Sequence, residues 1–391
     1  MWAACIDAKI EKAAHCIHDD AQIQSRFAHS AAAGARLTVS YQRPSWLPTY
    51  LPELDGLRGL AILGVVIYHC DYKQLATTRL HGAAQWAWVG VILFFVLSGF
   101  LVTANLLAAR EKPGYFHHFH ARRALRIWPV YLLTLAIVYA RSDWFIGPQP
   151  LEAIRTAPWW AYLLFVQNLF HLTLPPALVP TWALAMEEQY YFFWAPSVRW
   201  LRRPWMLAVV LTAAVICSPL TRHLNPHWLW GLPSHTLIKL DGIALGSLLA
   251  LGLYTLPISR RVWLWMGLGA FVVGMVCAGT IAGGTSLLDS ALAVGFTGAV
   301  LAAAASTGAR NPLSALLRRG PLAFYGRISY GLYLTHIMVF VFFGWFDHSM
   351  ARYGAAGVLA VVVFRLAATT AFAAALWYGF ESQILKLKRY F

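Results

Sequence analysis

The sequence has little charge. Only 12% of its 391 residues are Asp, Glu, Lys or Arg, whereas 59% are hydrophobic. A soluble globular domain carries roughly 25% charged residues, so about half of the usual charge is missing. This shortage excludes a disordered or fibrous chain and argues against a soluble enzyme. Because apolar segments follow one another almost without a break between residues 54 and 380, lipid is the expected main solvent.

Acidic residues are especially scarce, since 16 Asp and Glu stand against 31 Lys and Arg. In a soluble protein such an excess would suggest a nucleic-acid partner. Here the basic residues form short clusters between apolar stretches, as in the cytoplasmic loops of membrane proteins, and no nucleic-acid partner is expected. The five cysteines are odd in number and form no CxxC pair. Neither a disulfide framework nor a metal site is therefore predicted.

The apolar segments predict an all-α membrane protein with about ten transmembrane helices, because a spanning helix needs about 20 mainly apolar residues. The predicted spans lie near residues 54–71, 85–108, 124–141, 182–198, 205–220, 235–254, 263–281, 289–308, 324–345 and 355–379. A further apolar segment, Trp159–Leu172, is short and lies among prolines. Segments of this length are more often re-entrant than spanning, and we predict a re-entrant segment here.

The basic clusters determine the predicted orientation. If Trp159–Leu172 does not cross the membrane, the cluster between Arg110 and Arg126 and the later basic clusters all fall on one side. Loops rich in Lys and Arg are cytoplasmic, so both termini are predicted to be cytoplasmic. The predicted regions are a polar, flexible N-terminal extension at 1–50, a transmembrane domain at 51–381 and a basic cytoplasmic tail at 382–391.

Two ionisable residues lie inside the first predicted span, where a charged group is costly and is a functional candidate by default. Arg58 and His69 are eleven residues apart, which places them roughly 16 Å apart on nearly the same face of a helix. Asp55, three residues before Arg58, can pair with it. A histidine in a polar cavity can act as base, nucleophile or proton relay. The alternative is an interfacial histidine that caps the helix end.

Two further motifs admit either a functional or a structural interpretation. Arg123 and Arg126 share one face of a helix start, and guanidinium groups favour phosphates, but ordinary cytoplasmic flanks carry such arginines as well. Ser98 and Gly99 allow two helices to approach closely, and packing alone would explain them as well as function does.

Acidic residues recur in the fourth and sixth predicted spans. Glu187 and Tyr191 share a face one turn apart, where the carboxylate could orient an imidazole or deprotonate a hydroxyl. The adjacent Glu188 is expected to face lipid headgroups. Lys239 and Asp241, at the entry of a helix, are expected to form an interfacial ion pair.

A polar stripe lies on one face of the ninth predicted span. It consists of Ser329, Tyr333 and His336, and packing does not readily explain such a stripe in a membrane. Arg365, deep in the last span, needs an acidic partner for the same reason. The acids available to it in the spans are Asp241 and Glu187.

Five short motifs occur in order along the chain. They are Asp55-Gly-Leu-Arg58 with His69, Phe94–Leu101, Arg123 with Arg126, Thr181-Trp182 with Glu187 and Tyr191, and Ile328–His336. Over about residues 52–381 they make the chain resemble the acyltransferase-3 family of multipass bacterial membrane O-acyltransferases. The departures from the family pattern are Ala183 for a usual serine, Ile92 where many members have an acid, and Ser382 for the proline that commonly follows Glu381.

The resemblance implies an enzyme that moves an acyl group from acyl-CoA to a hydroxyl of an envelope glycan or a small molecule. Acetyl-CoA is the donor that the family favours. By position, His69 would be the catalytic base or acyl carrier, with Arg58 and Glu187 as further catalytic residues, and Arg123 and Arg126 would bind the phosphates of the coenzyme. The substrate-pocket candidates are Asp55, Ser98, Tyr191, Asp241, Ser329, Tyr333 and His336.

The resemblance also implies a place in the bacterial cytoplasmic (inner) membrane, a glycan or lipid-linked saccharide as acceptor, and no metal. The acceptor stays open among lipopolysaccharide O-antigen, capsule or exopolysaccharide, peptidoglycan, a membrane-derived glucan and a macrolide-like metabolite. The competing hypothesis is a multipass transporter or flippase whose intramembrane His, Arg and Glu relay protons or hold a polar substrate. Release of coenzyme A by the purified protein separates the two hypotheses, because a transporter should show none.

Overall fold

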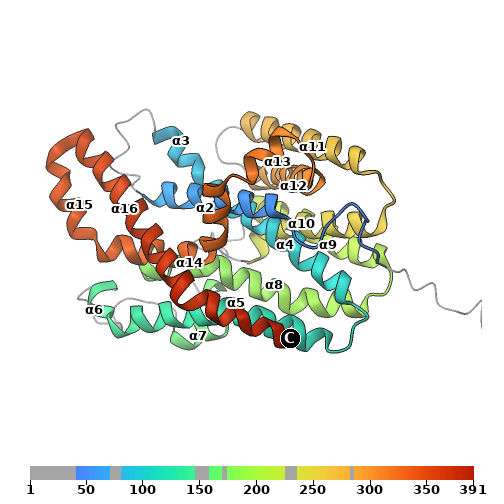
Figure 1. Ribbon diagram of the computed structural model, residues 1–391, viewed down its shortest axis with the longest axis horizontal. Coiled ribbons are helices and arrows are strands. Elements are labelled where there is room, and N and C mark those ends of the chain that lie inside the picture. The colour runs from blue at the N-terminus through green and yellow to red at the C-terminus, as the bar shows by residue number, and fades with distance from the viewer. Residues whose placement is uncertain (1–40, 71–80, 146–157, 170–173, 225–235, 282–285) are drawn as a thin grey trace, which may run out of the picture. The chain divides into compact units, whose positions relative to one another are not determined.

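The computed structural model describes residues 41–70, 81–145, 158–169, 174–224, 236–281 and 286–391 (Figure 1). Within these ranges the chain forms helices and no β-strand, which confirms the predicted all-α class. Each of the ten predicted spans contains a helix. These helices are α2 (Pro52–His69), α4 (Gly90–Ala109), α5 (Tyr115–Ala140), α8 (Thr181–Trp200), α9 (Pro204–Leu224), α10 (Leu240–Thr255), α11 (Arg260–Thr280), α12 (Leu288–Ser306), α14 (Gly320–Phe342) and α16 (Gly354–Leu376).

Shorter helical segments connect the long helices. The short α-helices are α3 (His81–Trp86), α6 (Ser142–Phe145), α7 (Trp159–Leu163), α13 (Pro312–Leu317), α15 (Gly344–Met350) and α17 (Ser382–Leu385). The single turns are η2 (Ala87–Val89), η3 (Gln167–Leu169), η4 (Pro176–Leu178), η5 (Thr236–Ile238), η6 (Ala351–Tyr353), η7 (Trp377–Glu381) and η8 (Lys386–Tyr390). In the described part of Trp159–Leu172 only α7 and η3 form, and both are far too short to cross a bilayer.

Six helical segments of the described chain are long and apolar enough to cross a membrane. They are Ala84–Ala109, α5, α9, α11, α12 and Gly354–Tyr390. A seventh results if α14 and α15, which meet at an angle of 57°, form one span. α10 is apolar but has only 16 residues, and α2 and α8 carry charged residues within their length. The protein is therefore a multipass membrane protein, while ten spans and cytoplasmic termini stay predictions.

Glycines allow the helices around α2 and α4 to pack very closely. A Cβ atom on Gly326 of α14 would lie 2.0 Å from the carbonyl oxygen of Asp55 in α2. A Cβ atom on Gly99 of α4 would lie 1.9 Å from the carbonyl oxygen of Ile243 in α10. Small residues are the usual means of close helix approach in membranes, so the close packing expected at Gly99 is confirmed.

A buried carboxylate fixes the start of α2. Glu53 accepts hydrogen bonds from the hydroxyl groups of Thr307 (2.8 Å) and Ser314 (2.6 Å) and is fully buried. A buried acid is costly unless it is hydrogen-bonded in this way. α2, which carries both Arg58 and His69, is thus anchored to α13 and to the end of α12.

Arg365 of α16 does not pair with Asp241 or Glu187, so that expectation was wrong. Its guanidinium group forms an ion pair with Asp347 of α15 and donates a hydrogen bond to the carbonyl oxygen of Cys70 (3.1 Å). Asp347 reaches α16 because the chain bends sharply between α14 and α15. No sequence periodicity indicates a bend at that point.

Both ends of the described chain contact the helices. In the predicted N-terminal extension, residues 1–40 lie outside the described residues, but Leu47 is buried and Arg43 donates a hydrogen bond to the hydroxyl of Tyr254 (2.9 Å). In the predicted tail, α17 and η8 are helical, and Arg122 of α5 donates a hydrogen bond to the carbonyl oxygen of Phe391 (3.0 Å).

Candidate active site

Two cavities lie toward opposite ends of α2 and α4. The large cavity has a volume of about 940 Å³, and the small cavity has a volume of about 160 Å³. α2 contributes Arg58 to the large cavity and His69, its last residue, to the small one. A rise of 1.5 Å per residue separates these two positions by roughly 16 Å along the helix axis. The predicted separation of the two residues therefore places them in different cavities.

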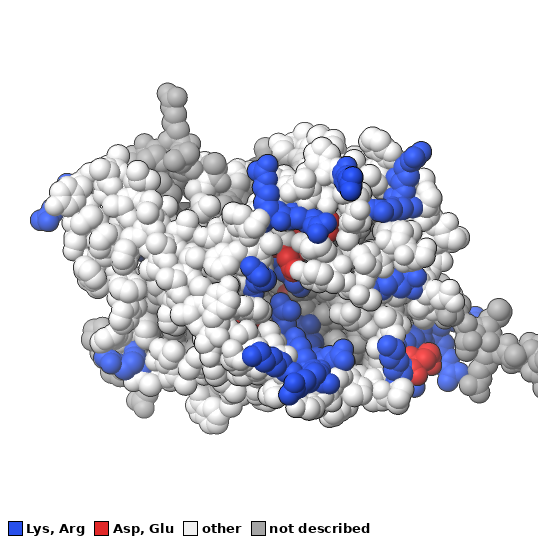
Figure 2. Space-filling model, in the orientation of Figure 1, with Lys and Arg blue, Asp and Glu red and all other residues white. Residues whose placement is uncertain are grey.

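The large cavity is strongly basic. It opens on a face where Lys and Arg side chains gather around a hollow (Figure 2). The basic residues that line it are Arg43, Arg58, Lys112, Arg122, Arg123, Arg126 and Lys388, and the one acidic lining residue is Glu187. An excess of cations in a water-filled concavity attracts anions.

Two of these arginines are already compensated. Arg58 pairs with Asp55 at 3.2 Å, as predicted, so Asp55 orients a cavity residue. Arg123 pairs with Glu188 at 3.3 Å and stacks on the ring of Tyr191 at 3.5 Å from the ring centroid. The expectation that Glu188 faces headgroups was therefore wrong, because the neighbouring α5 brings a guanidinium group to it.

Two further cations of the cavity, Arg126 and Lys388, form no ion pair among the described residues. Lys388 lies close enough to Arg126 for their like charges to repel, and the buried carboxyl group of Glu381 attracts both. Their guanidinium and ammonium groups are suited to phosphate.

A short hydrogen bond joins two predicted site residues inside the large cavity. The Ser98 hydroxyl donates to Oε1 of Glu187 at 2.6 Å, and both residues line the cavity. The residues come from α4 and α8, 89 positions apart in the sequence. The structure therefore brings Ser98, Glu187 and Tyr191 together with Arg58, as the prediction of a common pocket requires.

The small cavity contains two histidines in contact. Nε2 of His336 lies 3.3 Å from Nδ1 of His69, and the ring centroids are 5.0 Å apart. His336 is fully buried in α14. The pairing joins a predicted catalytic residue to a predicted pocket residue across 267 positions of sequence.

Backbone carbonyls define the tautomers of both histidines. Nδ1 of His336 lies 2.7 Å from the carbonyl oxygen of Tyr333, and Nδ1 of His69 lies 2.9 Å from that of Val65. A carbonyl oxygen only accepts, so each Nδ1 carries a hydrogen, as the hydrogen-bond network assigns it. Nδ1–H of His69 is then shared between the carbonyl oxygen of Val65 (2.9 Å) and Nε2 of His336 (3.3 Å). This leaves the Nε2 lone pair of His69 free in a ring that lines the small cavity.

The two cavities adjoin at a wall of shared side chains. Val91, Phe95 and Tyr333 line both of them. Ser329, one turn before Tyr333, lines the large cavity and donates to the carbonyl oxygen of Gly326 (2.9 Å). The predicted polar stripe of α14 thus continues from the large cavity past the wall to His336.

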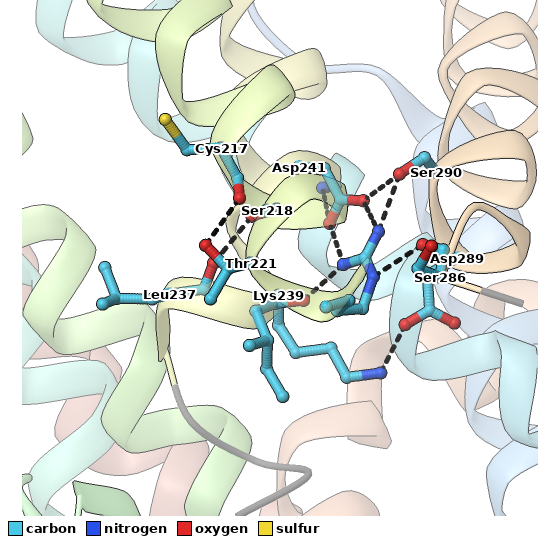
Figure 3. Close-up of polar contacts among 12 residues, drawn as sticks. Cys217, Ser218, Thr221, Leu237, Lys239, Asp241, Ser286, Asp289 and Ser290 are labelled. Carbon is cyan, nitrogen blue, oxygen red and sulfur yellow. Dashed lines mark hydrogen bonds and ion pairs between the residues drawn. The ribbon is translucent and has the colours of Figure 1, made fainter. Parts of the chain in front are cut away.

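Lys239 and Asp241 do not pair with each other, contrary to expectation (Figure 3). Lys239 pairs with Asp289 at 2.5 Å and lines the small cavity. Asp241 is buried, pairs with Arg222 at 2.7 Å, and lines neither cavity. Successive helical positions point in different directions, which separates the two side chains.

Several lining residues escaped the sequence argument. They are Lys388 and Arg122, which belong to basic clusters of the sequence, and Trp88. Composition does not indicate that these residues line a cavity, because the cavities form only where helices distant in sequence pack together. In the described part of the chain, no group of three or more His, Cys, Asp or Glu residues is placed to hold a metal ion.

Comparisons with known proteins agree with these features. The acyltransferase-domain family matches residues 51–378. A Listeria monocytogenes protein named as the peptidoglycan O-acetyltransferase OatA is 30% identical over 184 residues, which cover 43% of this chain and 28% of the relative. A Bacillus subtilis protein, YrhL, named as a candidate peptidoglycan O-acetyltransferase, is 29% identical over 186 residues, or 43% of this chain and 27% of the relative.

Staphylococcus aureus contains relatives named as candidate O-acetyltransferases, which are 35% identical over 153 residues, or 37% of this chain and 24% of the relative. In each of these three comparisons the match spans less than a third of the relative's own length. No solved structure matches the chain. The family match includes the lining residues of both cavities, apart from those near the two ends of the chain. Because this match covers most of the chain, the chain belongs to the acyltransferase-3 family.

Proposed function

We propose that the protein is a membrane O-acetyltransferase that moves an acetyl group from acetyl-CoA, bound in the large cavity, to a hydroxyl of a glycan that enters the small cavity. The observation that carries this proposal is the pair of cavities at opposite ends of α2, one cationic and one containing the His69–His336 pair. The names of the relatives support O-acetylation and a glycan acceptor.

The cations of the large cavity suit the donor. Coenzyme A carries several phosphate charges at one end and a thioester at the end of a long flexible arm. We assign direct phosphate contacts to Arg126 and Lys388, which form no ion pair among the described residues, and to the neighbouring Arg122. Arg123, compensated by Glu188, holds the adjoining cavity wall. Arg58 and the Ser98–Glu187 pair then lie along the path of the arm toward the wall.

The chemistry takes place at His69. Its Nε2 lone pair removes the proton from the acceptor hydroxyl, and the oxygen attacks the thioester carbonyl carbon. The carbon–sulfur bond breaks, and the leaving sulfur takes the proton back from His69. In the alternative route, Nε2 first attacks the thioester carbonyl carbon, the carbon–sulfur bond breaks, and coenzyme A leaves as its thiolate. The acceptor oxygen then attacks the acetyl carbon, the bond to Nε2 breaks, and the hydroxyl proton balances the charge of the thiolate. His336 is a positioning residue in both routes, because it accepts the Nδ1–H bond that fixes the imidazole.

The topology of the proposal follows the predicted orientation. The large cavity opens to the cytoplasm, where the donor is made, and the small cavity opens to the other side of the inner membrane. Neither polar substrate then crosses lipid, because the arm of the coenzyme spans the distance. To bring the thioester to His69, the arm passes between Val91, Phe95 and Tyr333, which line both cavities. Within this proposal, residues 51–381 form the catalytic membrane domain.

The test uses full-length protein in detergent and ¹⁴C-acetyl-CoA. His69→Ala should lower acetyl transfer by about 10²- to 10⁴-fold, the usual contribution of a general base, while coenzyme A still protects the protein against heat. The matched control is His348→Ala, an exposed histidine that lines neither cavity and should keep full activity. Full activity in His69→Ala, or no acetyl-CoA consumption by the wild type, would sink the proposal. Label found on His69 by mass spectrometry would select the acyl-carrier route.

A further inference from the structure

The small cavity differs from the large one in its chemistry, and this difference identifies the class of its ligand. We infer that the small cavity binds one uncharged sugar ring, which packs on Trp88 and is hydrogen-bonded by the Lys239–Asp289 pair. The inference rests on the proposed function, because it concerns the acceptor of the same reaction.

The size of the cavity limits the ligand. Its volume is about 160 Å³, whereas sites for drug-sized molecules measure about 300–1,000 Å³. A single ring of a saccharide is the largest acceptor unit that such a space accommodates, so the rest of the chain must stay outside. Five Phe, Tyr and Trp residues line the cavity, namely Tyr68, Trp88, Phe95, Trp182 and Tyr333. Their rings offer flat, electron-rich faces to the C–H bonds of a pyranose.

The charge of the cavity excludes an anionic sugar. Lys239 is the one Lys, Arg, Asp or Glu among the lining residues, and its ammonium group lies 2.5 Å from Asp289. The ion pair has no net charge, in contrast to the excess of cations in the large cavity. A carboxylate on the ligand would therefore gain little from Lys239 and would be repelled by Asp289. The ammonium group still has two further N–H donors for sugar hydroxyls.

A buried ion pair holds Lys239 in place (Figure 3). Arg222 of α9 donates to Asp241 (2.7 Å) and Ser290 (2.7 Å), and also to the carbonyl oxygens of Ile238 and Ser286. Arg222 thereby ties the turn before Lys239 to the start of α12, where Asp289 lies. Such preorganised support is typical of a binding residue and has no evident use for a lysine that only flanks a membrane span.

The test measures saccharide binding directly, by the change in tryptophan fluorescence of the detergent-purified full chain. The probes are chitotetraose, which is neutral, and tetragalacturonate, which is anionic. The wild type should bind chitotetraose at least about tenfold more tightly than tetragalacturonate, and Lys239→Met should weaken chitotetraose binding about tenfold. Asp289→Asn should reduce the preference for chitotetraose over tetragalacturonate. The substitution removes the negative charge beside Lys239, so the ammonium group can then attract the anionic saccharide. Lys386→Met, which alters an exposed lysine outside both cavities, is the matched control.

Equal or tighter binding of tetragalacturonate, no binding of chitotetraose, or unchanged binding in Lys239→Met overturns the inference. If Lys239→Met does not fold, Trp88→Leu is expected to give the same loss and serves as the second variant. Acetyl-CoA consumption is measured on the same samples. Chitotetraose binding without any acetyl-CoA consumption contradicts the proposed function and leaves the sugar site standing, so the two failures are distinguishable.

Discussion

The two cavities share α2, α4 and a wall, yet their lining residues differ in charge. Seven Lys and Arg residues and one acid line the large cavity, and its Arg126 and Lys388 have no ion-pair partner among the described residues. The small cavity has one cation, Lys239, and Asp289 compensates it. The proposed transfer from a polyanionic donor to an uncharged sugar would require this asymmetry.

Some charged residues hold a neighbouring arginine in place, whereas others are proposed to bind the ligand directly. Asp55 and Glu188 hold Arg58 and Arg123 in fixed positions, and Asp241 does the same for Arg222. A buried ion pair contributes geometry more reliably than stability. The repulsion between Arg126 and Lys388 is partly offset by Glu381, and a bound polyanion would reduce it further.

The largest expected effect comes from removing Arg126 and Lys388, the two cations to which direct phosphate contacts are assigned. Arg126→Ala combined with Lys388→Ala should weaken binding of coenzyme A by about 100-fold, because two charge-assisted hydrogen bonds are lost. Isothermal titration with coenzyme A measures the change. Lys386→Ala is the matched control, since Lys386 lies on the same terminal segment and lines neither cavity. Unchanged affinity in the double variant would place the phosphates elsewhere.

A smaller effect is expected at the second histidine. His336→Leu should lower kcat for acetyl transfer by about 10- to 100-fold, as loss of a supporting hydrogen bond to a reactive imidazole usually does. His336→Gln, whose side-chain oxygen can accept from Nδ1–H of His69, should recover part of the loss. Affinity for coenzyme A should stay constant in both variants. Equal loss in the two variants would mean that His336 only fills space.

Removing the wall should merge the two cavities. Tyr333→Ala opens a path for water to the thioester, so the ratio of acetyl-CoA hydrolysis to acetyl transfer should rise by about fivefold or more. Tyr333→Phe keeps the ring and should leave the ratio close to that of the wild type. Both products are counted in one assay with labelled acetyl-CoA. A wild-type ratio in Tyr333→Ala would show that the wall does not exclude water.

The smallest expected effect is a difference between the two cavities in how strongly salt weakens ligand binding. Raising ionic strength from about 0.05 to 0.5 M shortens the Debye length severalfold and should weaken coenzyme A binding about threefold or more. Binding of chitotetraose in the small cavity should change by less than about twofold over the same range, because the cavity has no net charge. Equal salt dependence for the two ligands would contradict the assigned division of charge.

The sequence was sufficient for the helices and for most of the candidate residues. Apolar runs and helical spacing placed a helix in every predicted span, and the spacing of Asp55 and Arg58 predicted their ion pair correctly. Apolar runs and helical spacing involve residues that are close in sequence, so the structure that they predict does not depend on how the helices pack. The close approach at Gly99 was predictable for the same reason, since only a small residue permits it.

The ion-pair partners of charged residues on different helices could not be predicted from the sequence. Arg365 pairs with Asp347 because the chain bends between α14 and α15, and Glu188 meets Arg123 because α5 lies beside α8. An ion pair forms with whatever charge the packing brings within a few ångströms, and separation in sequence does not determine that distance.

The amino-acid sequence by itself determined that this chain is helical, apolar and equipped with Arg58 and His69 about three turns apart on α2. Only the tertiary structure decided that the two residues lie in different cavities, that His336 contacts Nδ1 of His69, and that Lys239 lines the same cavity as both histidines. Helical periodicity fixes which way a side chain points, whereas a cavity exists only where distant helices fail to fill the space between them.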